Sequence, residues 1–302
     1  MTDERRTVAV LGPGGVGGLL AALLARAGNR VVCLAGEESA RVLEKDGIAV
    51  RSPLFGEFTS RVETATELRE PVGAALIAVK HTALTAALDR LPATALDGGT
   101  LVVPFLNGVE HPAALRAHYG DAAPVAPATI RVESTRVAPG VIEHGSPFAE
   151  VDLTGDTVPR ERLNSLAGAL EWSGVSTRVL ADETAVLWAK MSFLAPFALL
   201  TTRHGLPLGE IRTRHRAELT ALVEETAAVS AASGAPMDPA EALRRYDAFR
   251  PATRSSMQRD AEAGRPVELD AIGGALLRAA RRHGVPVPVA AKVVEQLRAA
   301  GH

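Results

Sequence analysis

The segment that most constrains the fold of this chain is Gly12-Pro13-Gly14-Gly15-Val16-Gly17. It has the spacing G-x-G-x-x-G, follows the apolar run Thr7–Leu11, and opens an apolar helical pattern that Gly28 closes. In this context the first glycine permits a tight turn, the second lets a pyrophosphate approach the backbone, and the third lets helix and strand pack closely. The helix N-terminus then faces the phosphates. We therefore predict a dinucleotide site here; a glycine-rich turn without a ligand is the alternative.

As far as residue 180, apolar runs of strand length alternate with helical patterns. Strands are predicted at Thr7–Leu11, Val31–Ala35, Gly47–Arg51, Ala74–Val79, Thr100–Val103 and Val175–Leu180, with short strands between residues 129 and 153. Helices are predicted at Gly15–Ala27, Glu38–Lys45, Thr82–Arg90 and Pro159–Trp172. This β-α-β rhythm predicts a parallel sheet with helices on both faces.

After residue 181 the strand signals stop. The remaining patterns are helical and lie at Asp182–Thr202, Arg214–Ser233, Pro239–Phe249, Ala252–Ala263, Val267–Gly284 and Val287–Ala300. We therefore predict an α/β protein with two domains: a Rossmann-type parallel-sheet domain over residues 1–180, which binds a dinucleotide, and an all-helical domain over residues 181–302.

Composition excludes several classes of protein and site. The 33 Lys and Arg residues nearly balance the 35 Asp and Glu residues, which argues against a nucleic-acid binder held by counterion release. Cys33 is the only cysteine, so disulfides within the chain and cysteine-rich metal sites are excluded. The eight histidines show no zinc spacing, and we predict no metal.

Two segments resemble membrane-directed sequences. The start, with Arg5-Arg6 before an apolar run, resembles a signal peptide, but Gly12-Pro13-Gly14-Gly15 would break its helix. Thr184–Thr202 is long enough to span a bilayer, yet it contains Lys190 and Pro196, which favour a buried core helix. We therefore expect a cytoplasmic protein without a membrane partner.

Lys190 is the most informative single residue. Its neighbours at helical spacing are all apolar: Val186, Leu187, Phe193 and Leu194. A lysine on such a face is costly unless its ammonium reaches water or does chemical work. Desolvation lowers the pKa of a lysine, which suits a general acid near neutral pH. A snorkelling or ion-paired lysine is the alternative.

Two further candidates lie at carboxyl ends of predicted strands, where ligands bind in such folds. Lys80 ends the Ala74–Val79 strand, and Asn107-Gly108 follows the Thr100–Val103 strand in a chain with only three asparagines. A solvated charge and an ordinary turn are the respective alternatives. At the end of the second strand, Gly36 offers neither an acid for NAD nor a base for NADP, so the choice of cofactor stays open on these grounds.

Together these pieces resemble the ketopantoate reductase (2-dehydropantoate 2-reductase) family over nearly the whole chain. The matching features, in the family's order, are Gly12-x-Gly14-x-x-Gly17, Lys80, Asn107-Gly108, Leu187-Trp188-x-Lys190, Ser255-Ser256-Met257, Asp260, Gly264 and Glu268-x-Asp270. The resemblance implies a Rossmann domain followed by a helical domain that serves substrate binding and dimerisation, with the active site in the cleft between them. It also implies a cytoplasmic enzyme of pantothenate biosynthesis, with a homodimer as one possible assembly.

The resemblance assigns roles to single residues. Lys190 matches the catalytic lysine that donates a proton to the C2 oxygen of a 2-oxo acid as hydride arrives from NADPH, and Glu268 matches the acidic residue that helps hold and polarise that site. Asn107 and Ser256 match residues at the substrate and nicotinamide end. Lys80 matches a cofactor contact. NADP(H) is thus favoured, with NAD(H) as the alternative. A β-hydroxyacid dehydrogenase and a non-catalytic dinucleotide sensor are the competing functions.

The chain also departs from the family pattern. Leu194 and Ala198 occupy positions where members acting on ketopantoate usually carry asparagines, Leu208 and Thr253 replace two further polar positions, and Gly36 stands where an arginine often contacts the NADP phosphate. Leucine and alanine offer no partner to a substrate hydroxyl. We therefore expect Leu194 and Ala198 to line a pocket for an apolar 2-oxo acid.

Overall fold

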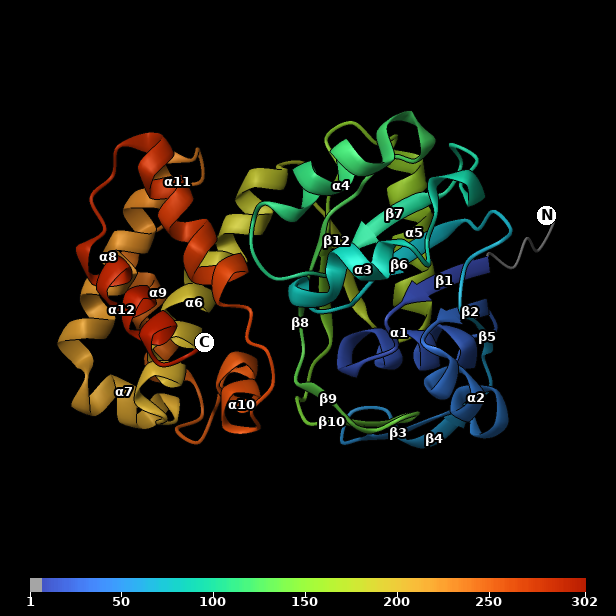
Figure 1. Cartoon of the computed structure of the whole chain (residues 1–302), viewed down its shortest axis with the longest axis horizontal. Coiled ribbons are helices and arrows are strands. Elements are labelled where there is room, and N and C mark those ends of the chain that lie inside the picture. Colours follow the sequence, from blue (N-terminus) through green and yellow to red (C-terminus); the bar gives the residue numbers. More distant parts are fainter. Residues whose placement is uncertain (1–6) are drawn as a thin grey trace. The chain divides into compact units, whose positions relative to one another are not determined.

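The computed structural model describes residues 7–302 (Figure 1), so Arg5-Arg6, weighed above as part of a signal peptide, lies outside the described residues. The chain divides into two compact units. The first comprises Met1–Leu106 and His111–Glu183, and the second comprises Asn107–Glu110 and Thr184–His302. The second unit therefore takes four residues from the first half of the chain, well before the predicted boundary at residue 180.

The first unit contains three β-sheets. The strand order of the largest is β5 (Glu63–Ala65), β2 (Arg30–Leu34), β1 (Thr7–Leu11), β6 (Ala74–Ile77) and β7 (Leu101–Pro104), and all of its neighbours pair in parallel. The second has the order β4 (Gly56–Ser60), β3 (Ile48–Ser52), β10 (Val141–His144) and β9 (Ser134–Ala138), and the third has the order β12 (Ser176–Val179), β11 (Glu150–Leu153) and β8 (Ala128–Arg131).

The helices of this unit are α1 (Gly15–Arg26), α2 (Glu37–Asp46), α3 (Leu84–Leu88), α4 (His111–Tyr119) and α5 (Arg160–Trp172), with short 3-10 turns at His81–Ala83, Ala93–Ala95 and Gly120–Ala122. α1 packs between the parallel sheet and the second sheet, which Figure 1 shows below it. Its leucines at positions 19, 20, 23 and 24 are buried in the core that these layers share. The apolar helix predicted from the glycine motif thus lies inside the unit because both of its faces are covered.

Four of the predicted strands form the parallel sheet, whereas Gly47–Arg51 and Val175–Leu180, which forms β12, lie in the other two sheets. The predicted strand Gly47–Arg51 forms β3, but β3 pairs antiparallel with β4 and parallel with β10, outside the Rossmann sheet. A three-residue turn joins β3 to β4, which suits a hairpin, whereas a parallel neighbour needs a long crossover. The place beside β2 is taken by β5, which is too short to give a clear sequence signal.

Every regular element in the described residues of the second unit is a helix or a helical turn. Its elements are α6 (Glu183–His204, whose first residue belongs to the first unit), α7 (Leu208–Arg214), α8 (Arg216–Ala232), α9 (Pro239–Ala248), α10 (Ser256–Glu262), the π-helical turn η4 (Asp270–Gly274), α11 (Ala275–His283) and α12 (Pro288–Ala299). The sequence did not predict α7. α10 begins four residues later than predicted because Ser255 caps it, its Oγ accepting the Gln258 amide N–H at 3.0 Å. The predicted helix Val267–Gly284 forms η4 and α11, which follow one another without a gap from Asp270 to His283.

Among the described residues, α6 is the helix whose length and apolar composition would allow it to cross a membrane. In its most apolar window 67% of the residues are buried within the protein. Its apolar side chains, among them Trp188 and Met191, belong to the core of the second unit. Helix α6 is therefore a core helix of the second unit, as expected from Lys190 and Pro196 within it.

Candidate functional site

The glycine-rich loop after β1 has the geometry that a pyrophosphate requires. Gly12 has a φ of +85°, and Gly17 packs so closely that a Cβ there would lie 2.3 Å from the Gly12 carbonyl oxygen. A Cβ on Gly14 would meet only that same oxygen, at 3.9 Å, so the backbone at Gly14 is open to a ligand. The three glycines thus fit the three roles assigned to them, and the loop leads directly into α1. These residues fit a nicotinamide dinucleotide.

Gly17→Ala should destabilise the protein by about 1–3 kcal/mol, as overpacking commonly does, and raise the Kd for a dinucleotide. The added methyl group must displace the Gly12 carbonyl and hence the loop. Gly168→Ala on α5 is the matched control, because a Cβ there meets nothing within 4 Å, and it should stabilise the protein by about 0.5–1 kcal/mol. Thermal unfolding and calorimetric titration with NADP⁺ measure both effects. Equal behaviour of the two variants would contradict the prediction.

Two other segments of the first unit meet this loop. The strand order places β6 next to β1, and a Cβ on Gly12 would lie 2.5 Å from Cγ1 of Val79, which immediately precedes the exposed Lys80. From β9, Ser134 donates its hydroxyl to the Gly15 carbonyl at 2.7 Å. Sequence analysis missed Ser134. The sequence signal that reflects this contact is Gly15, because a Cβ there would lie 2.4 Å from the Ser134 carbonyl oxygen.

In the second unit, Asn107 and Glu268 come together although they are 161 residues apart. The Asn107 Nδ2 donates to Glu268 Oε2 at 2.9 Å. The Glu268 residue is buried, with 8% of its surface exposed, and it lies two residues before the π-helical turn η4. A buried carboxylate requires charged or hydrogen-bonding partners, and π-helical turns recur at functional sites. The hydrogen bond therefore joins Asn107 and Glu268 into one buried polar pair.

The segment that carries Asn107 is fixed to the helices at two further points. Gly108 has a φ of +91°, and a Cβ there would lie 2.4 Å from the Ala271 carbonyl oxygen. Glu110 accepts a hydrogen bond from Nη2 of Arg278 at 2.7 Å, and Nη1 of the same guanidinium donates to Asp270 Oδ1 at 2.8 Å. This ion-paired network explains why residues 107–110 belong to the helical unit.

Asn107→Ala should lower the free energy of unfolding by about 1–3 kcal/mol, the contribution of a hydrogen bond to a buried charged group. Asn164→Ala is the control, because Asn164 is an exposed residue of α5, and it should change stability little. Denaturant unfolding of both variants provides the comparison. A loss no greater than that of the control would show that the Asn107–Glu268 hydrogen bond adds nothing to the fold.

The remaining predicted residues of the second unit differ in accessibility. Lys190 and Leu194 are half-buried on successive turns of α6, whereas Ala198, one turn further, is fully buried in the helical core. Ser256 is the exposed first residue of α10, and its buried neighbour Ser255 shares a hydrogen bond with Thr201 at 2.8 Å. Of the two apolar positions expected to line a pocket, Leu194 is therefore the accessible one.

One cluster with metal-ligand chemistry was missed by sequence analysis, because its residues do not have the spacing of a zinc site. In the described part of the chain, His204, His215 and Glu218 place ligand-type atoms within 4.8 Å of one another. His204 Nε2 lies 2.8 Å from Glu218 Oε2, its ring stacks on that of His215, and the Arg203 guanidinium pairs with the same carboxylate. Burial alone would raise the pKa of Glu218, but the His204 hydrogen bond and the Arg203 charge lower it. These contacts favour a structural ion pair between α6 and α8 over a metal site.

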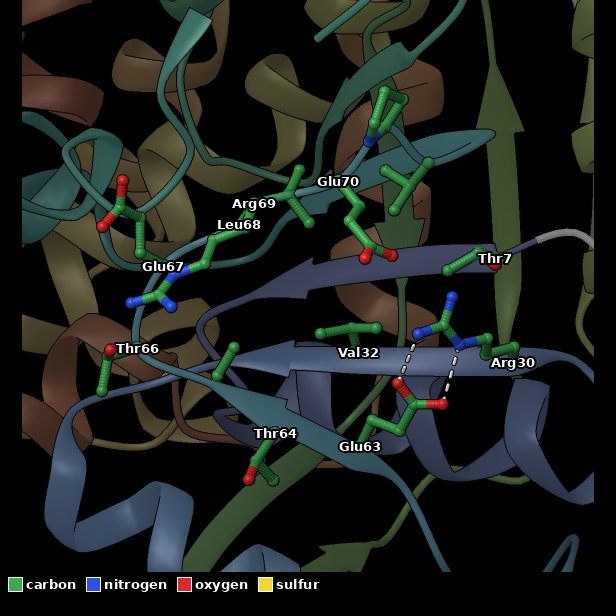
Figure 2. A pocket seen from close by; sticks show the side chains of 13 residues that line it. Thr7, Arg30, Val32, Glu63, Thr64, Thr66, Glu67, Leu68, Arg69 and Glu70 are labelled. Atoms are coloured by element: carbon green, nitrogen blue, oxygen red, sulfur yellow. Dashed lines mark hydrogen bonds and ion pairs between the residues drawn. The ribbon is translucent and has the colours of Figure 1, made fainter. Parts of the chain in front are cut away.

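A surface hollow of about 400 Å³ lies along β2, β5 and the segment that leads to β6 (Figure 2). Arg30 and Glu63 bridge one side of it through two hydrogen bonds of 2.8 and 2.7 Å. Both side chains are about half exposed, so this ion pair contributes little to stability. None of the predicted site residues lines the hollow, and it is distinct from the glycine-rich loop.

Comparison with known proteins agrees with both units. Residues 8–153 match the family model described as "Ketopantoate reductase PanE/ApbA", and residues 183–301 match the model of its C-terminal part. The chain is 30% identical to a 2-dehydropantoate 2-reductase of Caulobacter vibrioides, over 97% of this chain and 99% of the relative. It is also 30% identical to a 2-dehydropantoate 2-reductase of Mycobacterium tuberculosis, over 97% of both chains.

Solved structures show the same fold. The crystal structure of 2-dehydropantoate 2-reductase from Methylococcus capsulatus superposes with a TM-score of 0.88 at 26% identity, covering 98% of this chain and 96% of that one. A ternary structure of D-mandelate dehydrogenase with NADH and anilino(oxo)acetate superposes with a TM-score of 0.87 at 20% identity, covering 97% of both chains. The chain therefore belongs to the ketopantoate reductase family, whose members are oxidoreductases that use a nicotinamide dinucleotide and act on CH–OH/C=O groups.

Proposed function

We propose that this protein reduces an apolar 2-oxo acid to the 2-hydroxy acid with NADPH, and that Lys190 supplies the proton. The observation that carries the proposal is the buried Glu268 carboxylate held by Asn107 at 2.9 Å. The glycine-rich loop that fits the dinucleotide belongs to the first unit and this pair to the second, so a non-catalytic sensor would have no use for the pair. Retention of Lys190 together with the pair favours a reductase.

The glycine-rich loop after β1 would hold the dinucleotide, which would supply a hydride for C2 of a 2-oxo acid. The Lys190 ammonium, half-buried on α6, gives a proton to the C2 oxygen. Glu268 helps to hold and polarise the site. An asparagine amide has two N–H donors, so Asn107 can hold Glu268 with one and offer the other to the substrate carboxylate. The Ser256 hydroxyl can donate a further hydrogen bond to that carboxylate.

The apolar substrate class follows from Leu194. This side chain lies one helical turn beyond Lys190 and is accessible, and it offers no hydrogen bond to a hydroxyl group on the substrate. The likeness to D-mandelate dehydrogenase concerns the fold alone, so the argument rests on the residues of this chain. Assay of a panel of 2-oxo acids with NADPH and with NADH, followed at the nicotinamide absorbance band, tests the function. Tight dinucleotide binding without turnover of any member would instead favour a sensor.

Two further expectations belong to the proposal. We expect NADPH to be preferred over NADH, and we expect a cytoplasmic homodimer without a membrane or nucleic-acid partner. Comparing kcat/KM for the two cofactors tests the first expectation. Light scattering on the purified protein tests the assembly, and fluorescence microscopy of the tagged full-length chain tests its location.

A further inference from the structure

We infer that Arg90 recognises the 2′-phosphate of NADPH and so sets the cofactor preference of this chain. The inference rests on the proposed function, since it concerns which dinucleotide the reductase uses. It is carried by the position of the Arg90 guanidinium at the end of β2, next to Gly36. Neither the family resemblance nor the sequence pattern points to Arg90, which lies 54 residues after Gly36 in the chain.

The end of β2 is the place where a Rossmann unit distinguishes the two cofactors. After the last residue of β2, Ala35 and Gly36 lead into α2, which begins at Glu37. In such units the ribose 2′ position lies beside the residues that follow the second strand, and a basic side chain there accommodates the 2′-phosphate. Gly36 itself offers no side chain for this task.

Arg90 is held firmly at this point. It follows α3, and its carbonyl oxygen accepts the Leu68 amide N–H at 2.8 Å. Its Nη1 donates to the Ala35 carbonyl at 3.1 Å and to the Thr66 carbonyl at 2.9 Å. Because these carbonyls follow the neighbouring strands β2 and β5, the guanidinium is fixed at the carboxyl edge of the parallel sheet.

The missing side chain at Gly36 leaves room beside this guanidinium. A Cβ on Gly36 would have Nη2 of Arg90 as its nearest non-adjacent neighbour, at 3.8 Å. Both carbonyl contacts use Nη1, so Nη2 faces the space at Gly36. A fixed guanidinium with N–H groups directed at one space suits a phosphate, because its planar fork is already oriented.

The other basic residue nearby is less suited to this role. Arg41 on α2 lies 3.6 Å from Glu37, and both side chains are more than 70% exposed, so this ion pair is weak. Glu37 and Glu38 in the first turn of α2 would repel a phosphate. A cation of fixed position is therefore needed beside Gly36 to offset them, and Arg90 is that cation.

The test is the affinity of the whole protein for NADP⁺ and NAD⁺, measured by calorimetric titration without substrate. Arg90→Ala should raise the Kd for NADP⁺ at least about tenfold, as expected for loss of a charged hydrogen bond, and leave the Kd for NAD⁺ within about twofold. Arg41→Ala is the matched control and should change neither Kd by more than about twofold. An equal rise for both dinucleotides in Arg90→Ala would assign Arg90 a structural role and overturn the inference, as would an unchanged Kd for NADP⁺.

A second variant keeps Arg90 and its carbonyl contacts in place. Gly36→Glu is compatible with the backbone, since Gly36 has a φ of −67°, and it sets a carboxylate beside Nη2. It should weaken NADP⁺ binding at least about tenfold while NAD⁺ binding holds or improves. Unchanged discrimination in this variant also overturns the inference. Reduction of 2-oxo acids with NADH in that event would leave the reductase function standing, whereas Arg90-dependent NADP⁺ binding without any turnover would refute the function alone.

Discussion

Lys190→Ala should lower kcat by about 10²- to 10⁴-fold, the usual contribution of a positioned proton donor. The variant should bind NADP⁺ with a Kd within about twofold of the wild-type value, because the dinucleotide loop after β1 belongs to the other unit. Single-turnover reduction, followed at the nicotinamide absorbance band, separates the chemical step from binding. Lys292→Ala, on the exposed face of α12, is the control and should retain full activity.

Lys190→Arg sharpens the test, because it keeps the positive charge and most of the side-chain volume. A guanidinium does not give up its proton near neutral pH, so this variant should rescue little of the lost rate. Thermal unfolding checks that both variants are folded. A near-native kcat for Lys190→Ala would reduce Lys190 to a structural lysine on the face of α6, and full rescue by arginine would show that charge, rather than proton transfer, is what the reaction needs.

The Rossmann sheet could be predicted from the sequence because its signals are local. The apolar run Thr7–Leu11 and the glycines after it predict a strand, a turn and a helix within about twenty residues. The structure contains all three. The pairing of β3 was predicted wrongly because strand signals do not specify partners. Whether an apolar run joins a parallel sheet or a hairpin depends on the length of the segment that connects it to the next strand. The sequence pattern did not predict the partner strands β4 and β5.

The candidate site was only partly predictable for the same reason. Asn107 is a candidate because it follows a predicted strand, with an ordinary turn as the alternative, whereas Glu268 is identified by family resemblance alone. Their hydrogen bond joins segments 161 residues apart, a separation over which no local pattern carries information. Arg90 could not be predicted as a site residue at all, because in the sequence it only ends a predicted helix. Its candidate role depends on the hydrogen bonds to the carbonyls of Ala35 and Thr66, which orient its guanidinium.

Substrate preference should separate this protein from reductases that require a hydroxylated substrate. We expect kcat/KM for 3,3-dimethyl-2-oxobutanoate to exceed that for 2-dehydropantoate, which carries a hydroxymethyl group in place of one methyl group. The Leu194 side chain can offer that hydroxyl no hydrogen bond, and burying a hydroxyl unpaired costs about 1–3 kcal/mol. The preference should therefore be about 5- to 150-fold.

Leu194→Asn should reverse the preference, because an amide one helical turn beyond Lys190 can pair with the substrate hydroxyl. The ratio of the two kcat/KM values should move towards 2-dehydropantoate by about 10- to 100-fold, since a site built to bind a hydroxyl discriminates strongly for it. Leu243→Asn, at a half-buried leucine of α9, controls for the cost of a polar group in the helical unit and should leave the ratio unchanged. A wild-type preference for 2-dehydropantoate of about 10² or more, or about 2.7 kcal/mol, would refute the apolar pocket. Such a preference would mean that water or another polar group pairs with the hydroxyl beside Leu194.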